Sequence, residues 1–191
     1  MQTSEHRTAI DGIIAITESM GRFWRCSYGW APAEAATLLD SARLDRQASF
    51  AHTLYDYLEP FSCEESEAKQ ILGYVSLRSL CEGMLKLFFA VWLKDYLDEE
   101  DAVRDRNDSI VSPKEIKFDG VIAFYTKKID ADREPFLRRV QQRGNAIHCF
   151  TDRDIGTQDE LIDDIVQYRD FLLSVNARLP YPDDIYDPSY A

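Results

Sequence analysis

Two side chains of complementary chemistry lie five residues apart late in the chain, Arg143 and His148 in the segment RGNAIH. The imidazole of a histidine has a pKa near neutrality and can move the proton of a ribose 2′-hydroxyl. A guanidinium can hold a phosphate and stabilise the charge that builds on it. The pair therefore indicates phosphodiester cleavage in RNA without a metal ion or a covalent intermediate with the protein. One turn of an ordinary helix with two unrelated polar residues is the alternative interpretation.

The helix expected to carry this segment sets the two side chains apart. Its apolar stripe runs through Val140, Gly144 and Ile147. At about 100° per residue, Arg143 falls roughly 80° to one side of this stripe and His148 roughly 60° to the other. They can converge if the helix bends or ends at Gly144, or if two copies of the helix pack around a shared cleft. Glycine costs roughly 1 kcal/mol relative to alanine inside a helix, which favours a distortion, and close helix packing is the competing reason for a glycine.

A second group of polar residues lies in the segment LRSLCEGMLKLFF, within a helix expected over about residues 64–97. Arg78, Glu82 and Lys86 recur at steps of four and therefore share one helix face. The simplest interpretation is a ladder of salt bridges within the helix, worth about 0.2–0.5 kcal/mol per pair.

The order of these two segments resembles that of the HEPN superfamily of small α-helical domains. The pattern E-G-x-x-K in a long helix is followed much later by Arg, four to six residues and then His, in RGNAIHCF. A polar loop, the helical segment TQDELIDDIVQYRDFLLSV and the ending LPYPD complete the likeness. The likeness covers roughly residues 48–184, as helix order plus two short motifs, and points to the stand-alone bacterial members.

The resemblance implies a metal-independent endoribonuclease that acts as a homodimer, with the Arg/His motifs of two subunits facing one cleft. Arg143 would bind and polarise the scissile phosphate, and His148 would serve as general base or acid at the 2′-hydroxyl. Glu82, from the neighbouring helix, would orient one of these two side chains. The residue after the motif Arg is usually polar in the family, whereas Gly144 stands here, so Asn145 is the candidate for that role.

The charge of the chain is strongly negative, with 22 basic and 34 acidic residues and a net charge of −12. This argues against a general nucleic-acid coat protein, which needs a basic face. Six basic residues against three acidic ones nevertheless gather between Lys127 and Arg143, directly before the rest of RGNAIH. Arg138 and Arg139 from this cluster, together with Lys86, are the expected RNA-binding side chains. A solvated helix face is the alternative explanation of the cluster.

Helical patterns fill the chain, with no convincing strand alternation, internal repeat or second domain. Helices are expected over about residues 3–20, from Pro32 to about 58, over 64–97, from an N-cap at Ser112, and across 132–150. The last helix begins at a capping box formed by Thr157 and Glu160 and carries an apolar stripe to Leu179. The sequence therefore predicts one all-α domain over residues 1–191, a HEPN-like helical bundle of five or six helices with its core at about 48–184.

The four cysteines are widely spaced without a CxxC pair, and the three histidines stand at positions 6, 52 and 148. We therefore expect reduced thiols, no metal site and no cofactor. The N-terminus lacks the basic-then-apolar layout of a signal peptide, and the longest apolar run, residues 87–93, is too short to span a bilayer. A soluble, cytoplasmic protein without a membrane partner is expected.

The sequence favours a ribonuclease of the kind that HEPN families deploy in toxin–antitoxin or phage-defence systems, with an antitoxin or another partner protein. A catalytically inactive HEPN-like binding or assembly module is the second hypothesis. An unrelated all-α protein is the third, in which Arg143 and His148 lie far apart and Glu82 reaches neither.

Overall fold

The fold is built from helices whose apolar residues recur every three or four positions. The computed structural model describes residues 2–148 and 150–182. Within these residues it contains eight α-helices, three short 3₁₀-helices and no β-strand. The α-helices are α1 (Gln2–Arg25), α2 (Ala33–Ser41), α3 (Leu44–Thr53), α4 (Ser66–Val91), α5 (Leu93–Asp98), α6 (Phe118–Lys128), α7 (Glu134–Gly144) and α8 (Gln158–Asn176). The 3₁₀-helices are η1 (Leu54–Tyr57), η2 (Ala131–Arg133) and η3 (Asn145–Ile147).

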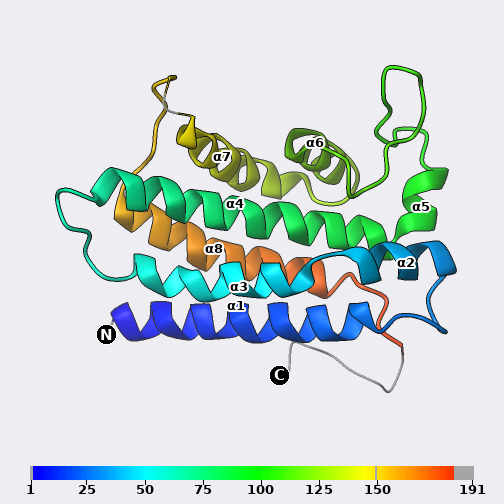
Figure 1. Ribbon diagram of the computed structural model, residues 1–191, viewed down its shortest axis with the longest axis horizontal. Helices are drawn as coiled ribbons and strands as arrows, with labels where there is room; N and C mark the ends of the chain where they lie inside the picture. The colour runs from blue at the N-terminus through cyan, green and yellow to red at the C-terminus, as the bar shows by residue number, and fades with distance from the viewer. Residues whose placement is uncertain (1, 149, 183–191) are drawn as a thin grey trace.

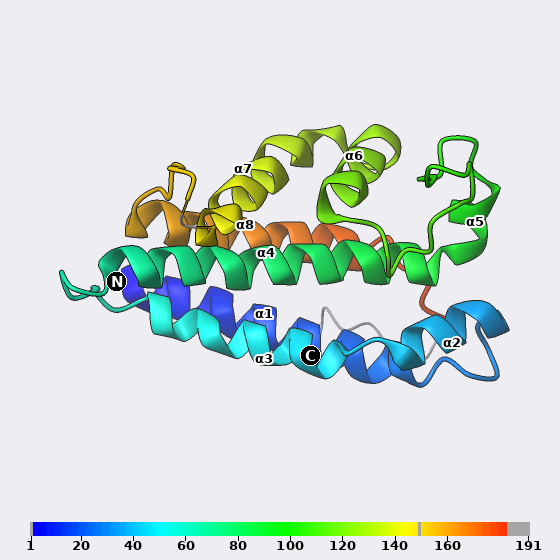
Figure 2. The same ribbon diagram turned by 45° about the horizontal axis from the view of Figure 1, so that its top comes forward.

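α4 is the central helix of the bundle. It contacts α3, α6, α7 and α8, and it runs between α6 and α7 on one side and α1 and α3 on the other (Figure 1 and Figure 2). Leu77, Cys81, Met84 and Phe88 recur along it at steps of four and three and are all buried. These side chains belong to one hydrophobic core that the helices share. The predicted all-α, single-domain bundle is confirmed.

Two of the predicted helices are broken, which raises the number of α-helices above the predicted five or six. The segment after Pro32 divides into α2 and α3 because Ala42 has an extended backbone, with a ψ of 137°. The long central helix ends as α4 at Val91, since Trp92 leaves the helical region (φ −90°, ψ 36°) and α5 follows. The indole nitrogen of Trp92 donates to the backbone oxygen of Arg178, 3.1 Å away. A contact with a distant part of the chain therefore accompanies this break.

The N-cap predicted at Ser112 is wrong, because α6 begins only at Phe118. The backbone oxygen of Ser112 instead accepts a hydrogen bond from the N–H of Glu115, at 2.8 Å, in an isolated turn. Lys117 has an extended backbone, with a ψ of 150°, so this turn does not continue into α6. Ile116 and Phe118 are both buried, which fixes the path of the segment against the core.

The capping box predicted at the start of the last helix is confirmed. Thr157 Oγ1 accepts from the N–H of Glu160 at 3.2 Å, and Glu160 Oε2 accepts from the N–H of Thr157 at 2.9 Å. The predicted apolar stripe of α8 is buried at Leu161, Ile165, Tyr168, Leu172 and Val175. The box thereby fixes the Glu160 side chain at the N-terminus of α8.

Cys81 is buried in α4, and Cys26 and Cys63 are exposed; all three are free thiols. Burial raises the pKa of the Cys81 thiol well above its usual value, so this side chain acts as a small apolar residue. In the described part of the chain, no helix combines the length and the apolar character needed to cross a membrane.

Candidate functional site

α7 carries the start of the segment RGNAIH and ends at Gly144, where the chain tightens into η3. A Cβ added to Gly144 would lie 2.8 Å from Cδ of Arg78 and 3.1 Å from the backbone oxygen of Tyr74, both on α4. Glycine therefore allows α7 to approach α4 closely. The two reasons expected for a glycine at this position, a helix end and close helix packing, therefore both apply, because α7 also ends at Gly144. The close approach explains why a small residue follows Arg143.

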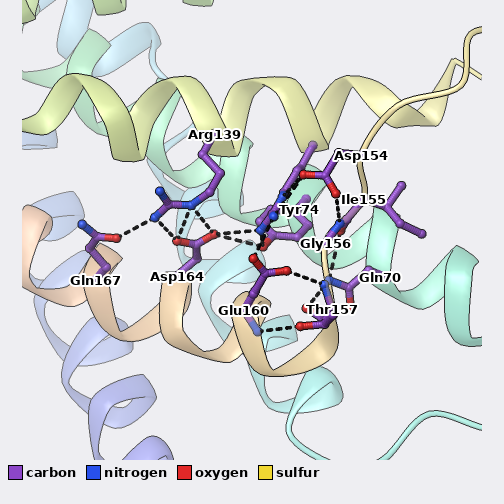
Figure 3. Close-up of polar contacts among 11 residues, drawn as sticks. Gln70, Tyr74, Arg139, Asp154, Ile155, Gly156, Thr157, Glu160, Asp164 and Gln167 are labelled. Atoms are coloured by element: carbon purple, nitrogen blue, oxygen red, sulfur yellow. Dashed lines mark hydrogen bonds and ion pairs between the residues drawn. The ribbon is translucent and has the colours of Figure 1, made fainter.

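Arg143 is buried, with 7% of its side chain exposed, and all three of its nitrogens are bonded within the protein. Nη1 donates to the Tyr74 hydroxyl at 2.7 Å, Nη2 to Oε1 of Glu160 at 3.0 Å and Nε to Oδ2 of Asp154 at 3.1 Å. A further carboxylate oxygen, Oδ2 of Asp164, lies 3.8 Å from Nη1. These partners come from α4, α8 and the segment before α8 and converge on one point (Figure 3). In this arrangement the guanidinium offers no unbonded nitrogen to a phosphate.

Asp164 on α8 is the buried centre of the same cluster. It accepts from Tyr74 Oη at 2.9 Å and from Arg139, whose Nη2 lies 2.6 Å from Oδ1. Arg139 also donates to Oε1 of Gln167 at 2.8 Å. We call the six residues joined in this way the Arg143 network: Tyr74, Arg139, Arg143, Asp154, Glu160 and Asp164 (Figure 3). Two guanidinium groups face three carboxylates, and this pairing compensates the cost of burying charge.

Burial raises the pKa of the Tyr74 hydroxyl, and the carboxylate of Asp164 raises it further. Tyr74 therefore stays protonated at neutral pH and donates to Asp164 while it accepts from Arg143. Burial acts to lower the pKa of Arg143, but hydrogen bonds to Glu160 and Tyr74 outweigh it and raise the pKa. The hydrogen bond to Asp164 likewise raises the pKa of Arg139. Both guanidinium groups are therefore permanently charged.

The segment 154–157 closes over the Arg143 guanidinium. Gly156 has a left-handed backbone with φ of +68°, and a Cβ added there would lie 2.6 Å from Cζ of Arg143, so both the backbone and the space require glycine. The N–H of Gly156 donates to Oδ1 of Asp154 at 2.9 Å, and this bond, followed by Arg143, lowers the pKa of Asp154. Gln70 on α4 holds the segment by donating to two of its backbone oxygens, at 3.2 and 2.7 Å.

His148 lies outside the Arg143 network, on an exposed turn directly after η3. Its backbone N–H donates to the backbone oxygen of Asn145 at 3.3 Å, and Asn145 is the half-buried C-cap of α7. Ile147 beside it is half exposed, and Phe150 is fully exposed. Within residues 2–148 and 150–182, no hydrogen bond or ion pair joins the side chains of His148 and Arg143. The single chain presents the imidazole to solvent and buries the guanidinium.

Glu82 stands in the salt-bridge ladder that the sequence predicts on α4. Its Oε1 lies 2.8 Å from Nζ of Lys86 and its Oε2 lies 3.8 Å from Nη2 of Arg78. Among the described contacts Glu82 reaches neither residue of the Arg/His pair within one chain, as the third hypothesis expects. Its connection to α7 runs through Arg78, whose side chain packs against Gly144.

The cations predicted to bind RNA are engaged in ion pairs. Arg138 Nη1 lies 2.5 Å from Oδ1 of Asp119, while Arg139 belongs to the Arg143 network and Lys86 to the ladder on α4. Arg153 differs from them: it is exposed on the segment before α8 and forms no ion pair with any other described residue. The sequence did not single it out, although it follows His148 by only five residues.

Comparisons with known proteins identify no relative: no family model matches the sequence, and no curated protein or solved structure matches it at a significant level. In the residues that the structure describes, no three His, Cys, Asp or Glu side chains are grouped so that they could hold a metal ion. The function is therefore inferred from the chain's own residues.

Proposed function

We propose that this protein is a metal-independent endoribonuclease of the HEPN type that works as a homodimer. The observation that carries the proposal is the exposed position of His148, on a turn with the exposed apolar side chains of Ile147 and Phe150. Apolar side chains grouped on a surface favour contact with another protein. A second copy that covers them with the same turn, around a two-fold axis, brings its own His148 close to the first.

Two histidines at such a contact supply the two proton carriers that RNA cleavage needs. One neutral imidazole takes the proton of the 2′-hydroxyl, whose oxygen attacks the phosphorus and forms a 2′,3′-cyclic phosphate. The bond from phosphorus to the 5′-oxygen breaks, and the imidazolium of the partner's His148 gives that oxygen its proton. These steps require neither a metal ion nor a covalent bond between RNA and protein.

In this proposal an RNA phosphate replaces Asp154 at Arg143. Of the three carboxylates around the guanidinium, Asp154 has the most exposed side chain, at 75%, against 50% for Glu160 and 3% for Asp164. Glu160 is also held by its capping box, and Asp164 by Arg139. A phosphate oxygen accepts the same N–H groups as a carboxylate oxygen. Asp154 is therefore the partner that RNA displaces, and it inhibits the site when RNA is absent.

Replacing Asp154 by asparagine should raise the affinity for RNA by about 3- to 10-fold, because one charged competitor for Arg143 is removed. The amide of asparagine keeps an acceptor oxygen for the N–H of Gly156, so the turn is preserved. Fluorescence anisotropy with labelled RNA measures the affinity. Asp152→Asn, which makes the same change of charge on an exposed side chain two residues earlier, should have less than about a twofold effect. An unchanged affinity in Asp154→Asn would contradict the exchange.

The nuclease proposal is tested with purified protein, RNA and an excess of EDTA. The protein should cut the RNA and leave 2′,3′-cyclic phosphate ends, because the 2′-oxygen is the nucleophile. RNA of the same sequence with 2′-O-methyl groups should stay intact, since it lacks that nucleophile. Failure to cut both structured and single-stranded RNAs would reject the nuclease.

As a nuclease the protein would act in the cytoplasm, where its RNA substrate is. An antitoxin or another partner protein would control it by covering the turn that carries Ile147 and Phe150. This arrangement suits a toxin or a phage-defence effector.

A catalytically inactive HEPN-like binding or assembly module is the second candidate, and the bonding of every Arg143 nitrogen within the protein favours it. In that role the Arg143 network fastens α7 to α8, and Ile147 and Phe150 dock a partner. This candidate predicts a stable complex, no cleavage in EDTA and no gain in RNA affinity from Asp154→Asn. Oligomeric state alone does not separate the two candidates.

A further inference from the structure

A pocket of about 230 Å³ lies where α2, α3 and α4 meet the segment 112–117. Three buried leucines line it, Leu39, Leu44 and Leu87, and we call them its floor. α2 lies at one end of the bundle and the end of α7 lies toward the other, so the pocket is separate from the Arg143 network (Figure 1 and Figure 2). The volume is below the roughly 300–1,000 Å³ of pockets for drug-sized ligands, which suits a smaller molecule.

Three cationic side chains line this pocket, and no carboxylate residue does: Arg43, Lys86 and Lys114. In a chain with a net charge of −12, a pocket lined by cations and by no carboxylate is unusual. α3 begins at Leu44, on the same wall, and its N-terminus adds the partial positive charge of the helix dipole. The pocket therefore combines an apolar floor with an anion-attracting rim.

Two of the three cations, Arg43 and Lys86, are already paired with carboxylates. Arg43 is clamped by Asp45, with Nε to Oδ1 at 2.8 Å and Nη2 to Oδ2 at 2.5 Å. Lys86 lies 2.8 Å from Oε1 of Glu82 and donates to the backbone oxygen of Lys114 at 3.2 Å, which ties the two walls together. The exposed Lys114 side chain forms no ion pair with any described residue. An anion would meet Lys114 without a competing carboxylate.

Gly83 on α4 gives the pocket its shape. A Cβ added to Gly83 would overlap the side-chain amide of Gln47 from α3. Gln47 uses this space to donate from Nε2 to the backbone oxygen of Leu80 at 2.6 Å. Glycine therefore leaves room for the Gln47 side chain between α3 and α4, and Lys86, three residues later, lines the pocket. The E-G-x-x-K pattern thus has a local structural reason of its own.

We propose that this pocket binds a small molecule that carries a phosphate group on an apolar body. The phosphate lies against the three cations, with Lys114 as its main contact, and the apolar body lies on the leucine floor. This site is distinct from the Arg143 network, and its occupation does not depend on RNA cleavage.

The probe for this site is phenyl phosphate, titrated into the full-length protein by isothermal calorimetry. It should bind saturably at one site per chain and more tightly than inorganic phosphate, because phosphate alone leaves the apolar floor uncovered. Phenol should bind more weakly than phenyl phosphate, because it carries no charge for the cations. Lys114→Ala should weaken phenyl phosphate binding by at least about fivefold, and since the side chain is exposed the variant should fold normally.

Lys127→Ala is the matched control, because it removes the same charge from an exposed lysine of α6 that is paired with Asp101 at 2.9 Å. It should bind phenyl phosphate as tightly as the wild type does. His148→Ala should also bind it normally, whether or not that variant cuts RNA. Absence of saturable binding would overturn the proposal. So would equal losses in the two lysine variants, or phenol binding as tight as that of phenyl phosphate.

Discussion

Replacing His148 by alanine is expected to lower RNA cleavage by at least about 100-fold, because a positioned acid–base group contributes roughly 10²- to 10⁴-fold. The side chain is exposed and forms no hydrogen bond or ion pair with another described side chain, so the free energy of unfolding should change by less than about 0.5 kcal/mol. Cleavage rates are compared in EDTA on the same RNA, and stability is compared by urea denaturation. An effect on activity without an effect on stability is the signature of a proton carrier.

His52→Ala is the matched control for this experiment. His52 is an exposed histidine whose Nε2 lies 3.0 Å from Oε1 of Glu18, and its helix, α3, lies on the opposite side of α4 from α7 (Figure 1 and Figure 2). Its loss should leave cleavage unchanged. If His148→Ala cut RNA as fast as the wild type, the imidazole would not be the proton carrier and the catalytic proposal would fail.

Mixed dimers test whether two His148 side chains share one cleft. If one acts as base and the other as acid, a dimer with a single wild-type subunit is inactive. Adding His148→Ala protein at a constant total concentration should then lower cleavage with the square of the wild-type fraction. A decrease in direct proportion to that fraction would contradict a shared cleft and favour one independent site per subunit.

The sequence predicted the fold best where the signal is local. The capping box of Thr157 and Glu160 and the apolar stripe of α8 involve residues within a few turns of one another, and both are present. The break at Trp92 is different, because its indole is bonded to the backbone of Arg178, 86 residues away. The spacing of apolar residues along the sequence does not reveal such a contact, so one long helix was predicted where α4 and α5 occur.

The same distinction explains which part of the candidate site was predictable. A regular helix places Arg143 on an exposed edge of α7, but the segment 154–157 and Glu160 cover that edge and bury the guanidinium. His148 lies beyond the end of α7, where a fixed 100° per residue no longer applies. Asp164 did carry a local signal. It lies next to Ile165 on the buried side of α8, where a carboxylate requires a charged partner.

Replacing Arg143 by methionine is expected to destabilise the protein by about 2–4 kcal/mol, because the variant removes a buried guanidinium that is bonded to three side chains. Methionine retains much of the side-chain volume, so the loss reports the missing charge and hydrogen bonds rather than a cavity. Tyr74, Asp154 and Glu160 each lose their bond to the guanidinium, whereas Asp164 keeps Arg139. Urea denaturation of the wild type and the variant measures the difference.

Arg138→Met is the matched control for this stability effect, since it makes the same change on the same helix. Among the described residues, Arg138 forms ion pairs with two exposed carboxylates, those of Asp119 and Glu134, so its loss should cost less than about 1 kcal/mol. If Arg143→Met lowered the free energy of unfolding as little as Arg138→Met does, the buried guanidinium would not be what joins α7 to α8. Its bonds to the carboxylates would then be easily exchanged, which would favour the nuclease over the inactive module.

The pH dependence of the stability difference between the wild type and Arg143→Met tests whether the carboxylates around the guanidinium are its source. Arg143, followed by the N–H of Thr157, lowers the pKa of Glu160 below its usual value of 4.5. A carboxyl whose pKa is lowered by folding stabilises the protein above its usual pKa, and this stabilisation is lost as the pH falls toward the folded pKa. The stability gap between the wild type and Arg143→Met should therefore narrow from about pH 6 to about pH 3. If the difference in free energy of unfolding stayed constant over this range, it would come from packing. The ion pairs of Arg143 with Glu160 and Asp154 would then contribute nothing to stability.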